Sequence, residues 1–376
     1  MIITKRVFLL AALFVLFLTQ KTFASTDTAK SYCVMNSVTG EIVEEKSPDE
    51  TLPMASTTKI ATLLVAVENS SPEDIITVSN SAVMQEGSSA YLLPEAKITM
   101  RDLCYGLMLN SGNDAAVVIA EHISGNQAEF AKLMNSVAKK AGAKNTNYVN
   151  PNGLPDENHY TTATDMARLT RYALKNKEFR KIVSTVSYTS TMTMPDGEIK
   201  KTPYLNHNRL LRELDGCIGV KTGFTEAAGR CLVSAVNRDG AEYIIVTLND
   251  SDDWNTHKEL CEKAFNGKVE RKIIKKGDCI KHIKSGKEEC SLIAKKDFSV
   301  AVNGGKNDFE VVKCLPKTMN FPLNKGEKVG YVNIKANGEI IGTVDMVSEK
   351  DFYPKSEKML KNCFWFAVLI ILRNLI

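Results

Sequence analysis

The chain has 376 residues, of which 44% are apolar and 24% charged, a composition typical of globular rather than disordered proteins. This length favours more than one domain and leaves ample chain for a full core. The net charge of +4, from 48 basic and 44 acidic residues, is too small over this length to indicate nucleic-acid binding.

The first residues have the pattern of an export signal. Lys5 and Arg6 precede an apolar run over residues 7–18, and small residues follow around Ala24. A basic start, about a dozen apolar residues and a small residue at the cleavage point are typical of a secretory signal peptide. We therefore expect residues 1–24 to be removed on export. The alternative is an uncleaved membrane anchor, which this run is short for.

Residues 25–266 mix helical and strand patterns. They predict a hairpin over 31–45 that turns at Thr39-Gly40, followed by helices over 56–67, 100–110, 115–123, 127–142 and 164–175. Strands are predicted over 183–194, from residue 220, and over 231–236 and 243–248, before a closing helix over 254–265. Helices enclosed between an N-terminal strand pair and a C-terminal strand set predict an α/β body with an antiparallel sheet.

The end of the chain has a different texture. Short strand patterns in residues 267–350 alternate with Gly, Asn and Lys turns and predict a small all-β domain. Residues 351–376 contain an apolar run over 363–372 flanked by cations. A spanning helix needs about 20 apolar residues, so this run instead favours a segment lying in the membrane interface. A last helix packed on the preceding domain is the alternative.

Nine cysteines are spread along the chain without a C-x-x-C pair or a Cys/His cluster of zinc spacing. An odd number leaves at least one thiol unpaired, and most are expected to be small buried apolar residues. No metal, no cofactor and no catalytic cysteine is predicted.

The first motif with chemical meaning is Ser56-Thr57-Thr58-Lys59, at the start of a predicted helix. Residues three apart share a helix face, so the Ser56 hydroxyl and the Lys59 amine can meet. A serine becomes nucleophilic when a base takes its proton, and a lysine is such a base when burial or nearby cations lower its pKa. Alone this pattern is weak, because a serine cap followed by an exposed lysine has the same letters.

A second motif, Ser111-Gly112-Asn113, lies in the break between two apolar helices. From such a break the side chains can point into a cleft. The Ser111 hydroxyl could relay a proton to a leaving group, and the Asn113 amide could orient both Lys59 and a substrate amide.

The third motif, Lys221-Thr222-Gly223, is predicted at the start of a strand. Lys221 adds positive charge, and Thr222 can hydrogen-bond a carboxylate. Gly223 lets an extended substrate approach the strand edge. The backbone N–H groups of Phe224 and Ser56 could form an oxyanion hole. Together, the three motifs predict a serine acyl-transfer site.

The order S-x-x-K, S-x-N and K-T-G resembles that of the low-molecular-weight penicillin-binding proteins, the serine D-alanyl-D-alanine carboxypeptidases of the bacterial cell wall. The resemblance covers about residues 31–265 and extends to 150–154, 159–167 and 206–208. It implies a penicillin-binding, β-lactamase-like transpeptidase fold, an antiparallel sheet with a helical cluster, over residues 25–266. It also implies that the β-rich domain lifts this body off the membrane, and that the C-terminal segment anchors it.

The resemblance further implies a mechanism. Lys59 would deprotonate Ser56, which would attack the penultimate carbonyl of a peptidoglycan stem peptide ending in D-Ala-D-Ala. Ser111, linked to Lys221, would protonate the departing D-alanine, and water would hydrolyse the acyl-enzyme. β-Lactams would mimic the substrate and stall at the acyl stage. The expected location is the extracytoplasmic face of the bacterial membrane or the cell wall.

One position departs from the family. His207 stands between two asparagines where well-known members have a cation. We therefore expect His207 to line the substrate site while Lys221 and Thr222 carry more of the contact with the terminal carboxylate.

Three other functions stay open on the sequence. A class A-like β-lactamase would need a glutamate to activate water, for which Glu157 is the one close candidate, and its second motif would read S-D-N rather than S-G-N. A D,D-endopeptidase would use the same residues. A non-catalytic cell-wall binding module would not need Ser56 and Lys59.

Overall fold

The computed structural model describes residues 28–285, 288–304 and 307–353. The predicted signal peptide and the apolar C-terminal segment lie outside these residues. Within the described ranges, no helix combines the length and the apolar character that crossing a bilayer requires.

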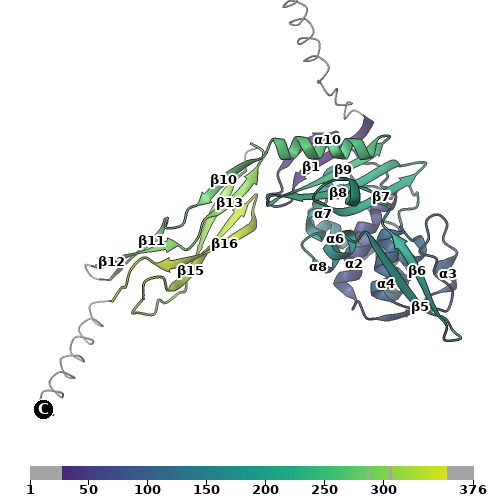
Figure 1. The fold of residues 1–376 in the computed structure, drawn as a ribbon, viewed down its shortest axis with the longest axis horizontal. Helices are drawn as coiled ribbons and strands as arrows, with labels where there is room; N and C mark the ends of the chain where they lie inside the picture. The colour runs from purple at the N-terminus through teal and green to yellow at the C-terminus, as the bar shows by residue number, and fades with distance from the viewer. Residues whose placement is uncertain (1–27, 286–287, 305–306, 354–376) are drawn as a thin grey trace, which may run out of the picture.

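A five-stranded antiparallel sheet with the order β2-β1-β9-β8-β7 organises the larger body (Figure 1). Its strands are β1 (Ala29–Asn36), β2 (Ile42–Lys46), β7 (Cys217–Thr225), β8 (Gly229–Arg238) and β9 (Ala241–Asp250). The predicted hairpin at Thr39-Gly40 is confirmed, since β1 pairs with β2. Strand β7 forms one edge of this sheet, and β2 forms the other.

Both faces of the sheet are buried, because alternate residues of a strand point to opposite faces. On one face, Leu232 and Val236 of β8 pack against helix α10 (Asp253–Asn266). On the other face, Val233 and Ala235 belong to the large core shared with the helices.

The helical layer contains α2 (Lys59–Asn69), α4 (Met100–Leu109), α5 (Asn113–Ser124), α6 (Gln127–Lys140) and α7 (Ala163–Ala173), close to the predicted ranges. The first eight residues of α2 are all buried, so this helix runs through the core. The strand predicted over residues 183–194 is wrong at its start, because residues 177–183 form helix α8 (Lys177–Val183) and strand β5 (Ser187–Thr193) begins only afterwards. The side chain of Asn176 caps this helix, and Phe179 and Val183 are buried on one side of it.

A second, four-stranded sheet lies against the helices, with the order β3-β4-β5-β6. It is formed by β3 (Ile75–Thr77), β4 (Lys97–Thr99), β5 (Ser187–Thr193) and β6 (Ile199–Leu205). The short helix α3 (Asn80–Val83) contacts α5, and α9 (Leu210–Glu213) contacts β7 of the first sheet. This sheet places the loop that carries His207 at the end of β6.

The remaining residues form an all-β unit, as the strand patterns predict. It contains a two-stranded sheet of β10 (Val269–Ile274) and β13 (Phe298–Val302) and a five-stranded sheet in the order β11-β12-β16-β15-β14. Its strands are β11 (Cys279–Ser285), β12 (Glu288–Ala294), β14 (Phe309–Cys314), β15 (Lys328–Ala336) and β16 (Glu339–Ser348). This unit has its own core, centred on residues such as Leu292, Val332 and Val344.

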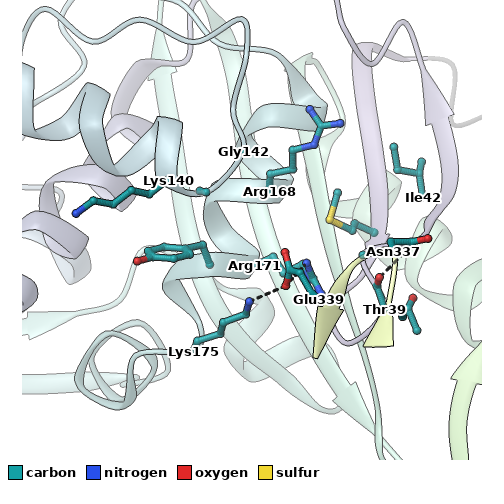
Figure 2. A pocket seen from close by; sticks show the side chains of 14 residues that line it. Thr39, Ile42, Lys140, Gly142, Arg168, Arg171, Lys175, Asn337 and Glu339 are labelled. Carbon is teal, nitrogen blue, oxygen red and sulfur yellow. Dashed lines mark hydrogen bonds and ion pairs between the residues drawn. The ribbon is translucent and has the colours of Figure 1, made fainter. Parts of the chain in front are cut away.

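Polar contacts join the β-rich unit to the larger body. Glu339, at the β15–β16 turn, pairs with Arg171 of α7 at 3.0 Å and with Lys175, just after that helix, at 2.9 Å. The nearby Asn337 donates to the backbone oxygen of Thr39. Figure 2 shows these side chains around a pocket of about 330 Å³ at the junction. The cations nearest to Glu339 are therefore already paired, and they fasten the hairpin tip to the body.

Among the described residues, eight cysteines are free, and five of them are buried. This agrees with the expectation that most are small apolar residues. Cys279 is exposed, and Cys363 lies outside the described residues.

Candidate active site

Ser56 lies in a short 3₁₀ helix, η2 (Ala55–Thr58), and the α-helix proper begins only at Lys59. The sequence predicts an α-helix from Ser56, and this prediction is wrong in the type of helix at residues 55–58. It favours the same pair more strongly, because residues three apart eclipse one another in a 3₁₀ turn. Ala55, directly before the serine, has a positive φ of 47°, a strained conformation of the kind found at functional sites.

The Lys59 amine is fully buried and surrounded by oxygen. It donates to Ser56 Oγ at 2.8 Å, to Asn113 Oδ1 at 2.7 Å and to the backbone oxygen of Asn152 at 2.6 Å. These contacts use all three donors of an ammonium group. The structure therefore brings together the first two motifs, and it adds a third contact that the motifs do not contain.

Burial lowers the pKa of Lys59 well below its usual 10.5, and the nearby charge of Lys221 lowers it further, while Asp114 opposes the shift. A neutral amine has a lone pair. When Lys59 is neutral, the 2.8 Å contact reverses, and the Ser56 hydroxyl donates to Nζ.

The loop of residues 150–153 is a part of the site that the three motifs miss. The Asn150 side chain accepts from the Gly153 N–H and donates to the Leu154 oxygen, which holds the loop in shape. Gly153 has a φ of +90°, and a Cβ there would lie 2.0 Å from the Ala55 oxygen. The resemblance places this loop in the family, but only the structure shows that its Asn152 oxygen touches Lys59.

His159 supports the turn that carries Ser56 through a chain of hydrogen bonds. Its Nδ1 accepts from the Val149 N–H at 3.1 Å, so Nε2 carries the proton and faces Thr58 Oγ1 at 2.7 Å. Thr58 in turn donates to the Ala55 oxygen. Burial lowers the pKa of His159 to about 4, so this chain of bonds rests on a neutral imidazole.

Ser111 and Asn113 lie where the sequence places them, between α4 and α5. Ser111 is buried and has a φ of +60°. Asn113 is fixed by a bond to the Glu86 oxygen. The next residue, Asp114, accepts from the N–H groups of Ala90 and Leu92, which holds the adjoining loop against the motif.

The third motif lies within β7 rather than at its start, and Lys221 is a buried residue of that strand. Burial lowers the pKa of Lys221 to about 7, and its Nζ donates to the backbone oxygen of Thr222. The expected link to Ser111 is not among the hydrogen bonds of the described residues. A Cβ on Gly223 would lie 3.0 Å from the N atoms of Ser56 and Thr57, so this strand runs directly beside the nucleophile's turn.

These elements enclose a cleft of about 300 Å³ at the edge of β7. It is lined by Ser56, Ser88, Ser111, His207, Thr222, Gly223, Phe224, Arg230, Asp253 and Trp254. Desolvation and the charge of Lys221 lower the pKa of His207, so its imidazole is neutral at neutral pH. Nowhere in the described ranges do three or more His, Cys, Asp or Glu side chains gather to hold a metal.

Glu157, the candidate water-activating residue of a β-lactamase, is exposed. The loop contact with Lys59 comes instead from a backbone oxygen, that of Asn152. A backbone carbonyl accepts hydrogen bonds but cannot take up a proton at neutral pH.

Comparisons with known proteins show the family and the fold. A model of the D-alanyl-D-alanine carboxypeptidase family matches residues 19–252, and a model of the C-terminal domain of penicillin-binding protein 5 matches residues 270–353. The chain is 30% identical over 336 residues to the D-alanyl-D-alanine carboxypeptidase DacF of Bacillus subtilis, covering 86% of this chain and 85% of that protein.

Solved structures also match. The D-alanyl-D-alanine carboxypeptidase DacD of Francisella tularensis superposes with a TM-score of 0.62 at 27% identity, covering 90% of this chain and 98% of that one. A Streptomyces DD-transpeptidase gives 0.60 at 31% identity, covering 64% and 96%.

The fold is therefore the penicillin-binding transpeptidase fold followed by an all-β domain, and the protein is an enzyme of the serine peptidase class. The chain belongs to the D-alanyl-D-alanine carboxypeptidase family.

Proposed function

We propose that this enzyme removes the terminal D-alanine from peptidoglycan stem peptides through a Ser56 acyl-enzyme, and that β-lactams acylate the same serine. The observation that carries the proposal is the buried 2.8 Å contact between Lys59 Nζ and Ser56 Oγ. Membership of the family supports the substrate class.

In acylation, neutral Lys59 takes the Ser56 proton, and Oγ attacks the penultimate carbonyl of the peptide. The desolvation that lowers the pKa of Lys59 makes the neutral amine available near neutral pH. The N–H groups of Ser56 and Phe224 stabilise the oxyanion, which the close approach of β7 to the nucleophile's turn supports. Asn113 holds Lys59 in line throughout.

Collapse of the tetrahedral intermediate breaks the peptide bond and leaves an ester on Ser56. Ser111 gives its proton to the departing amine of D-alanine and regains one from the Lys59 ammonium, which returns Lys59 to its neutral form. Its buried place at the cleft wall suits this transfer. Water then hydrolyses the ester, which releases the shortened peptide and restores the serine hydroxyl. Lys221, Thr222, Gly223 and His207 form the wall that receives the substrate.

We further propose that the enzyme works outside the cytoplasmic membrane and is tethered there by its C-terminal segment. The export pattern of residues 1–24 and the apolar run at 363–372 support this. The tether is tested by fractionating cells that express the chain with and without residues 354–376. We expect the shortened form to leave the membrane fraction.

The activity is tested with the purified protein, a fluorescent penicillin and diacetyl-Lys-D-Ala-D-Ala. We expect stable labelling and release of D-alanine, both lost in Ser56→Ala. Ser88→Ala is the matched control, because Ser88 lines the same cleft without contacting Lys59. Rapid turnover of penicillin without peptide cleavage would instead identify a β-lactamase, and absence of both reactions a binding module.

A further inference from the structure

Arg230 enters the cleft from the strand next to the K-T-G motif. Strand β8 pairs with β7 so that Arg230 lies opposite Phe224 and Leu232 lies opposite Thr222. Residues opposite one another and those two positions apart share a face of the sheet, and the diagonal distance is within reach of a long side chain. Arg230 and Thr222 therefore point to the same side of the sheet at its β7 edge, and both line the cleft.

The guanidinium of Arg230 is held in a fixed orientation. Its Nε and Nη2 atoms lie 3.0 and 2.9 Å from Oδ1 of Asp253, a carboxylate whose side chain is only 3% exposed. The guanidinium carbon lies 5.7 Å from the centre of the Trp254 ring. Asp253 and Trp254 begin α10, so the start of this helix positions the arginine.

Part of this guanidinium stays available to a ligand. Arginine has five N–H donors in a planar fork, and Asp253 engages one edge of it. The Arg230 side chain is 41% exposed. The donors on the other edge can therefore form the paired hydrogen bonds that a carboxylate accepts.

The other basic groups around the cleft differ from Arg230 in charge. Burial lowers the pKa of Lys59 well below its usual value and that of Lys221 to about 7. The pKa of His207 is also lowered, so this imidazole is neutral at neutral pH. A guanidinium stays protonated at every pH at which a protein works. Among the residues that line the described cleft, Arg230 thus supplies the permanent positive charge.

We propose that Arg230 receives the free C-terminal carboxylate of the substrate, together with the Thr222 hydroxyl, while Asp253 and Trp254 act as its positioning residues. This inference rests on the proposed function, because it concerns the same peptide in the same cleft. It assigns to strand β8 the cation that the resemblance implies at the position of His207, which lies in the loop after β6.

The assignment has a consequence for specificity. A peptide whose last residue is amidated or extended by a further residue offers no carboxylate at this point. When a neutral group is bound, the donors on the open edge of the guanidinium lose the charged acceptor that a carboxylate provides, although Asp253 still pairs with the other edge. Arg230 therefore favours removal of a free terminal residue over cleavage within a cross-link.

The test compares diacetyl-Lys-D-Ala-D-Ala with the same peptide ending in a carboxamide, using the full-chain protein. Wild type should cleave the carboxylate peptide with a kcat/KM about 10- to 100-fold higher, the value of a hydrogen bond to a charged group. In Arg230→Leu this preference should fall to within about twofold, through a higher KM for the carboxylate peptide with kcat for the amide little changed. Arg230→Lys, which keeps the charge and loses the fork, should recover part of it.

Arg209→Leu is the matched control. Arg209 also stacks on Trp254, at 4.8 Å, yet it does not line the cleft, so its loss should leave the preference intact. If Arg230 were only a structural link to α10, Asp253→Asn and Arg230→Leu would lower kcat/KM equally for both peptides.

The possible results distinguish a failure of the role of Arg230 from a failure of the proposed function. An active wild type that does not discriminate the two peptides, or an Arg230→Leu or Arg230→Lys variant that discriminates as well as wild type, overturns the role of Arg230 alone. A wild type that cleaves neither peptide and is not labelled at Ser56 overturns the proposed function itself. Because the wild-type comparison needs no variant, the test holds even if Arg230→Leu does not fold.

Discussion

Gly153 offers a direct test of how the loop of residues 150–153 supports the nucleophile. A Cβ at this position would lie 2.0 Å from the Ala55 oxygen, whereas such contacts essentially never fall under 3.0 Å. The obstacle is backbone, so no side chain can rotate away. In Gly153→Ala, about 1 Å must open between the loop and the turn that carries Ser56.

Two costs add in this variant. Holding a non-glycine residue at φ of +90° costs about 1–3 kcal/mol, and forcing an atom into a packed contact costs about another 1–3 kcal/mol. A displacement of about 1 Å at a reacting group lowers the rate by up to about a hundredfold. We therefore expect Gly153→Ala to lose about 2–6 kcal/mol of unfolding free energy and to be acylated far more slowly by penicillin.

Comparison with Gly142→Ala isolates the cost of forcing an atom into the packed contact. Gly142 has nearly the same φ, +87°, but a Cβ there would meet only the Arg168 side chain, at 3.9 Å. Urea unfolding and the rate of fluorescent penicillin labelling are measured for both variants. If Gly153→Ala is no less stable than Gly142→Ala and is labelled at the wild-type rate, the loop of residues 150–153 does not set the position of Ser56.

Two further predictions follow from buried charges. The pKa of Lys221 is about 7, so its ammonium is present below pH 7 and is lost as the pH rises. The KM for the carboxylate peptide should therefore rise about tenfold between pH 6 and 9, while the KM for the amide peptide stays flat; parallel profiles would contradict this. Asp114→Ala leaves the N–H groups of Ala90 and Leu92 without their acceptor and should cost about 2–5 kcal/mol in urea unfolding, against a marginal effect of the exposed control Glu157→Ala.

The sequence predicts which side chains come together better than it predicts their local conformations. The hydroxyl of Ser56 and the amine of Lys59 are three residues apart, and both an α-helix and a 3₁₀ helix bring them together. The motif therefore predicts the contact although the helix type is wrong. Long periodic helices such as α6 are also predicted well, because their apolar spacing repeats over several turns.

Features that depend on chain segments meeting in three dimensions are not visible in a motif. The Asn152 contact with Lys59 is made by a backbone oxygen, which any residue type carries. Strands β3 and β4 have three residues each, too few to show an alternating pattern. Arg230 gains its meaning only from its register opposite Phe224 and from the arrival of Asp253 at the sheet edge.

Gly112 limits how this enzyme can evolve. A Cβ at this position would lie 2.6 Å from Oδ1 of Asp114 and 2.8 Å from the backbone N of Ala90, two atoms that are hydrogen-bonded to each other. The S-G-N motif therefore cannot become S-D-N by a single step without disrupting the loop that Asp114 holds. A lineage that took this path would first need a compensating change in residues 88–92, so an intermediate of low stability lies between this enzyme and an S-D-N form of it.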